Sequence, residues 1–160
     1  MKNLVLVAVL LFSLTSKAQV NVETVVDEMT DKVSYYASER FICADESMTK
    51  GCAIDPSFSE SKGVKEVKHL IVTMVGLGNC NENNELIILF DNGEKITLKS
   101  WNKFNCKGNA YFSITNTTTE KLKTNPISKV RITNGDSYKS YTSEITYKNY
   151  FIDLYNNLND

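Results

Sequence analysis

Four cysteines are the residues of this 160-residue chain whose type and spacing suggest the clearest chemistry: Cys43, Cys52, Cys80 and Cys106. They are 9, 28 and 26 positions apart, whereas zinc sites use ligand pairs a few residues apart, and no histidine is near them in sequence. Disulfide formation is therefore favoured over metal binding, and free buried thiols are the remaining alternative. We expect no metal site and no cofactor.

His69 is the only histidine, which excludes any mechanism that needs two. Val67 and Ile71 lie two positions away on either side, so we predict a structural, half-buried histidine. The motif Gly-x-Ser-x-Gly is absent, and no catalytic residue can be assigned. A hydrolase stays open as an alternative, because the members of a Ser-His-Asp triad are distant in sequence and converge only in the fold.

Aromatic side chains offer a possible ligand surface. On predicted strands these are Tyr35, Tyr36, Trp101, Tyr111, Tyr138 and Tyr141. Strand propensity alone places aromatics there, but Trp101 shares the face of Lys95, Thr97 and Lys99 that we predict to be exposed. Trp101 and Tyr111 are therefore the candidate ligand contacts, and a carbohydrate-binding module that stacks sugar rings on them is an alternative function.

The N-terminus predicts a secretory signal peptide over residues 1–18. Lys2 is positive, residues 4–14 are apolar except for Ser13, and small Ser16 and Ala18 precede a cut before Gln19. The apolar run is about half the roughly 20 residues that a membrane-spanning helix needs. We expect a secreted or periplasmic protein with no membrane span after signal removal, and oxidation of its cysteines.

Composition and charge narrow the possible partners. Eighteen Lys and Arg against 19 Asp and Glu give a net charge of −1, so no basic excess exists to bind nucleic acid. The whole chain is 42% hydrophobic. Positions 19–160 are long enough for a single β-rich domain with its own core.

Short alternating segments between turn residues predict antiparallel strands. Residues 86–90 and 95–99 flank Asn92-Gly93, which predicts a hairpin with a two-residue type I′ turn. A second hairpin, 127–133 with 136–146, surrounds Asn134-Gly135. Further strands are expected at 20–26, 33–42, 64–75 and 110–115, and an irregular loop at 44–63.

Helix is scarce in the sequence. Phe151, Leu154, Tyr155 and Leu158 recur at helical spacing and predict one short C-terminal helix that must dock on the sheet. The resulting fold class is mainly β, an antiparallel sandwich or strongly bent sheet of about seven strands.

Alternating strand directions then select a disulfide pairing. With short loops, Cys43 and Cys52 fall in one connection, and Cys80 and Cys106 flank the open end of the 85–101 hairpin. We predict the bridges Cys43–Cys52 and Cys80–Cys106.

Residues 86–93, Cys106, 118–132 and 150–154 resemble small exported proteins of Bacteroidota-type bacteria. The resemblance covers about half the chain, and that family has no assigned activity. It implies an exported β-rich protein and supplies no site. The function that we expect is non-enzymatic binding or an accessory role in the envelope, with an envelope protein or a glycan as partner.

Overall fold

The computed structural model describes residues 20–158, so the predicted signal peptide lies outside the described residues. The strands are β1 (Val22–Asp27), β2 (Lys32–Ala37), β3 (Phe41–Ala44), β4 (Gly51–Ser61), β5 (Val64–Val75), β6 (Glu85–Phe90), β7 (Lys95–Lys99), β8 (Asn109–Ser113), β9 (Ile127–Thr133) and β10 (Ser140–Glu144). The helices are α1 (Asn116–Thr124) and α2 (Tyr150–Asn156). The predicted fold class, mainly β and antiparallel with a short C-terminal helix, is confirmed.

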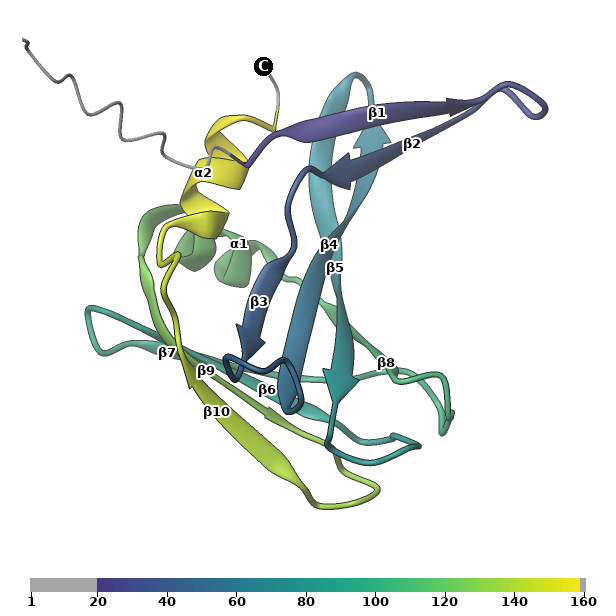
Figure 1. The fold of residues 1–160 in the computed structure, drawn as a ribbon. Coiled ribbons are helices and arrows are strands. Elements are labelled where there is room, and N and C mark those ends of the chain that lie inside the picture. Colours follow the sequence, from purple (N-terminus) through teal and green to yellow (C-terminus); the bar gives the residue numbers. More distant parts are fainter. Residues whose placement is uncertain (1–19, 159–160) are drawn as a thin grey trace, which may run out of the picture.

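Two four-stranded antiparallel sheets pack on one core. Their strand orders are β3-β4-β5-β8 and β10-β9-β6-β7, and the helices close one end (Figure 1). Inward positions alternate along each strand, as in Leu86, Ile88 and Phe90 of β6, all at most 1% exposed. An isolated bridge between Ser100 and Phe112 links the end of β7 to β8, so the two sheets are joined at one corner.

Strand β4 corrects the prediction of an irregular loop at 44–63. It pairs with β5 along its whole length and with β3 over residues 51–54. Its inner positions Cys52, Ile54 and Pro56 are buried, but the residues between them are small or polar. A strand whose outer face is polar therefore looked like a loop in sequence, and the structure has ten strands where we expected about seven.

The β6–β7 hairpin is confirmed, but its turn is not type I′. The Gly93 N–H donates to Phe90 O at 3.0 Å, so the central residues of the turn are Asp91 and Asn92, neither of which has a positive φ; Gly93, with φ 84°, follows them. Asn92 Oδ1 instead accepts from the Glu94 N–H at 2.9 Å, which holds Asn92 at an ordinary negative φ.

Helix α1 is a second helix beside the single C-terminal one that the sequence predicted. Thr115 caps it, since its Oγ1 accepts from the Thr118 N–H at 3.2 Å. Helix α2 buries Phe151 and Leu154, as the helical spacing predicted, and also Tyr150. Neither helix in the described part of the chain has the length and apolar character that crossing a membrane requires.

Strands β1 and β2 form a separate two-stranded hairpin that projects as an arm (Figure 1). Its apolar residues are largely exposed, with Val26 at 54% and Met29, in the turn, at 92%. The arm reaches the main body through Tyr35, whose hydroxyl donates to Glu60 of β4.

Candidate ligand-binding face

The outer face of the β3-β4-β5-β8 sheet collects aromatic and polar side chains. The ladders set Asp55, Ile71 and Tyr111 in one row across three strands, and Thr73 opposite Asn109 in the next. We call this surface the outer-face site and define it by its aromatic members His69, Trp101 and Tyr111, by Ile71, and by its polar members Arg40, Asp55, Thr73 and Asn109.

Three rings lie side by side at one end of the outer-face site. The Trp101 ring centroid is 5.3 Å from that of Tyr111 and 5.8 Å from that of His69. Trp101 is 57% exposed, so one side of its indole stays open to solvent. The two predicted ligand contacts, Trp101 and Tyr111, are thus neighbours, and His69 joins them.

A hydrogen-bonded polar chain runs beside the rings. Arg40 donates from Nε and Nη2 to the Asp55 carboxylate at 2.7 and 2.5 Å, and from Nη2 to Thr73 Oγ1 at 3.2 Å. Thr73 in turn donates to Asn109 Oδ1 at 3.1 Å. A bidentate guanidinium–carboxylate pair has a fixed geometry, so these groups form an ordered array of donors and acceptors.

A bulge in β5 puts Val67 and His69 on opposite faces of the sheet. The β4–β5 register shifts between Ser57 and Phe58, so that Val67 turns inward at 6% exposure while His69 and Ile71 point outward. The sequence had placed Val67 and His69 on one face, which is wrong for this reason. His69 Nδ1 is buried and has no hydrogen-bond partner among residues 20–158, so no carboxylate of the described residues orients the ring through that nitrogen, as the acid of a Ser-His-Asp triad would.

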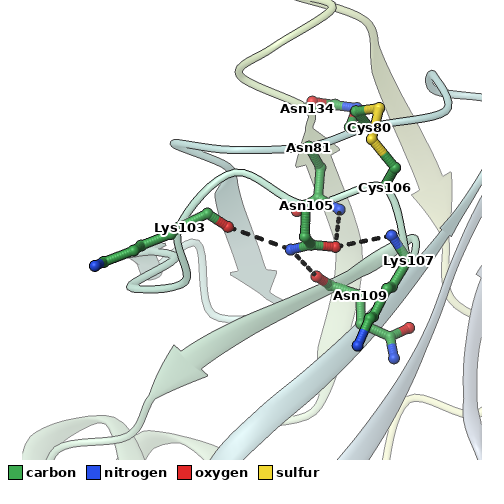
Figure 2. Close-up of a disulfide and its surroundings, with 8 residues drawn as sticks. All are labelled: Cys80, Asn81, Lys103, Asn105, Cys106, Lys107, Asn109 and Asn134. Atoms are coloured by element: carbon green, nitrogen blue, oxygen red, sulfur yellow. Dashed lines mark hydrogen bonds between the residues drawn. A yellow bond between two sulfur atoms is a disulfide. The ribbon is translucent and has the colours of Figure 1, made fainter.

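The disulfide Cys80–Cys106 forms as predicted and fixes the loop that carries Trp101. The two cysteines flank the open end of the β6–β7 hairpin, which is why their pairing could be predicted although β4 was missed. Beside the bridge, Asn105 Nδ2 donates to Lys103 O and Asn109 O, each at 3.3 Å, and its Oδ1 accepts from the Lys107 N–H (Figure 2).

Buried asparagines extend this framework. Asn84 and Asn81 are at most 1% exposed, and Asn84 Nδ2 donates to Asn81 Oδ1 at 2.9 Å. Asn102 links these two asparagines to β8, because its Nδ2 donates to Asn81 Oδ1 and its Oδ1 accepts from the backbone N–H of Tyr111 at 3.0 Å. The Trp101 N–H donates to Tyr111 O at 3.1 Å. We missed this network in the sequence; its signal is the density of asparagine at 79–84 and 102–109.

The predicted Cys43–Cys52 bridge is absent, although the two cysteines do lie directly opposite each other on β3 and β4. Both are free thiols and 1% exposed, and the two thiols are hydrogen-bonded to each other. Burial is the main cause that raises the pKa of Cys43 well above its usual value. Strand pairing therefore places the two thiols side by side, as the predicted bridge required, and they remain unlinked in the structure.

The remaining tyrosines lie elsewhere. Tyr35 and Tyr36 are on β2, Tyr141 is on β10, and Tyr138 is 87% exposed in the turn between β9 and β10. Of the six predicted aromatics, only Trp101 and Tyr111 therefore meet. Within the described residues no cluster of three or more metal-ligating side chains occurs, and Asp45 accepts instead from the N–H groups of Thr49 and Lys50.

Neither a family of known proteins, nor a curated protein, nor a solved structure matches this chain. What the outer-face site can do must therefore be argued from its own geometry.

Proposed function

We propose that this protein is an exported, non-enzymatic binding domain of the cell envelope and that the outer-face site holds its ligand. Export is supported by the signal-like N-terminus and by a disulfide in the same chain. The resemblance to small exported proteins of Bacteroidota-type bacteria points the same way.

The observation that carries the proposal is the exposed Trp101 on a rigid frame. Trp101 packs against Tyr111 and His69, yet more than half of its side chain stays exposed and its apolar surface remains in water. The disulfide and the asparagine network nevertheless hold its loop in place. Rigid aromatic platforms lose little conformational entropy on binding, which favours a ligand site over a packing accident.

A glycan is the ligand class that this face fits. The C–H faces of a sugar ring stack on tryptophan and tyrosine, and its hydroxyls need donors and acceptors beside the ring. Arg40, Asp55, Thr73 and Asn109 supply both at the edge of the aromatic row.

Direct binding measurements test the proposal. Trp101 is the only tryptophan, so its fluorescence reports on ligand in the wild-type protein. We expect a change in emission on adding native envelope fraction or members of a panel of chito-, cello-, malto-, xylo- and manno-oligosaccharides. By calorimetry, Trp101→Ala should weaken binding at least tenfold with little change in Tm.

Tyr138→Ala is the matched control, since it removes another exposed aromatic on the opposite sheet and should bind like the wild type. Absence of binding to every probe would overturn the proposal. Turnover of any substrate on a broad hydrolase panel, lost on replacing His69, would favour the hydrolase instead.

A further inference from the structure

A groove between β2 and β4 lies next to the outer-face site. Its volume is about 430 Å³, and its walls include Tyr35, Tyr36, Ser57, Ser59 and Glu60. Tyr36 is 55% exposed, while Tyr35 is held by its hydrogen bond to Glu60 and by the Lys65 ammonium 5.2 Å from its ring centroid. The groove therefore has one fixed and one open aromatic side chain.

Ser57 and His69 connect the groove to the rings around Trp101. Ser57, in its wall, is the cross-strand partner of His69 and so points to the same side of the sheet. His69 in turn contacts Trp101. One track thus leads from Tyr36 past Ser57 and His69 to Trp101.

Free backbone edges line the groove. β3 covers β4 only over residues 51–54, so the edge of β4 beyond Ile54 lacks a ladder partner on the side where β2 lies. The N–H and C=O groups along such an edge are available to ligand hydroxyls. A peptide strand does not fit between them, because Cα atoms of β2 and β4 approach within 8 Å and an inserted strand needs two spacings, about 9.6 Å.

We infer that the ligand is an extended oligosaccharide that occupies two subsites, one on Trp101 and Tyr111 and a second at Tyr36 in the β2–β4 groove. This inference rests on the proposed function. Neighbouring strands are about 4.8 Å apart, so the track from β2 across β4, β5 and β8 to Trp101 is about 15–20 Å long, enough for several linked sugar rings.

The test compares oligosaccharides of one to six rings from the same panel by calorimetry, on wild type and on Tyr36→Ala. We expect affinity to rise with ring number up to about four rings, at least tenfold between two rings and four. Tyr36→Ala should abolish this rise and change the affinity for two rings less than twofold. Trp101→Ala should weaken binding at both lengths.

The outcomes separate the two proposals. If sugars bind at Trp101 but equally well at two and four rings, or if Tyr36→Ala has no effect on long oligomers, the second subsite is wrong and the proposed function stands. If no sugar binds, the glycan proposal itself fails. Binding of an alternating valine–lysine peptide that is lost in Tyr36→Ala would assign the groove to peptides instead.

Discussion

Three tyrosines near helix α2 keep their protons at unusually high pH. Burial raises the pKa of Tyr147 and of Tyr155 to about 12 each, and it also raises that of Tyr150 strongly. For Tyr147 a second cause is the hydrogen bond that its hydroxyl donates to Asp153 Oδ2 at 2.6 Å. Because the folded state holds these protons more tightly than the unfolded chain, their contribution to stability is present below pH 10 and is lost as the pH rises towards 12.

Absorbance at 295 nm should therefore show at least two classes among the eight tyrosines, with these three ionising last. The urea midpoint should fall between pH 10 and pH 12. Tyr147→Phe should remove one late-ionising group and part of this pH dependence. Titration of all eight together near pH 10 would contradict the prediction.

Cys43 and Cys52 should be unreactive in the native protein. Both are 1% exposed, and the raised pKa of Cys43 keeps its thiol protonated, whereas the nucleophile is the thiolate. An Ellman titration should find no thiol in buffer and two in denaturant without reductant. Two thiols that react at once in buffer would show that β3 opens, and none in denaturant would show that the pair has been oxidised.

At the scale of elements, the loop between β7 and β8 depends on the bridge and the asparagines more than on apolar packing. Trp101 and Phe104 in this loop are more than half exposed, so hydrophobic contacts contribute little to its conformation. Asn81 and Asn105, by contrast, exchange backbone hydrogen bonds at 2.8 and 3.1 Å. The bridge keeps the two segments in register for this pairing.

Replacing both bridge cysteines, Cys80→Ala with Cys106→Ala, should lower the free energy of unfolding by about 3–4 kcal/mol in the chain-entropy model. It should also raise the mobility of Trp101, seen as lower fluorescence anisotropy, and weaken glycan binding. Reduction of the wild-type bridge should reproduce both effects. Unchanged anisotropy would mean that the asparagines alone hold the loop.

At the scale of the molecule, one core joins both sheets and both helices. Phe112 occupies the point where the sheets meet, since it is 0% exposed and pairs with Ser100 beyond β7. A shared core predicts that the sheets unfold together.

Phe112→Ala should cost about 3–5 kcal/mol through the cavity that it leaves. The variant should unfold at a lower urea concentration than the wild type. Within each protein, however, circular dichroism and Trp101 fluorescence should report the same urea midpoint as each other. Ser113→Ala is the matched control, because Ser113 is the next residue and exposed, and it should shift the midpoint little. Two separate transitions would contradict a single cooperative core.

The hairpin, one disulfide and the C-terminal helix could be predicted from the sequence because residues close together in the chain determine them. The β6–β7 hairpin follows from an apolar run at 86–90 and an alternating run at 95–99 on either side of Asn92-Gly93. The Cys80–Cys106 pairing follows because both cysteines lie at the open end of that hairpin. Helix α2 follows from the spacing of Phe151 and Leu154. These predictions need only neighbouring residues and the geometry of a strand or a turn.

Tertiary structure alone decided the rest. The length of β4 depends on its pairing with β5, because its outer residues are polar. The bulge opposite Ser57 and Phe58 turns Val67 away from the face of His69 through a register shift that the sequence periodicity does not indicate. Cys43 and Cys52 are brought opposite each other only by the pairing of β3 with β4, and they stay free thiols. His69, Trp101 and Tyr111 come from three separate segments, so their convergence exists only when the sheet is assembled.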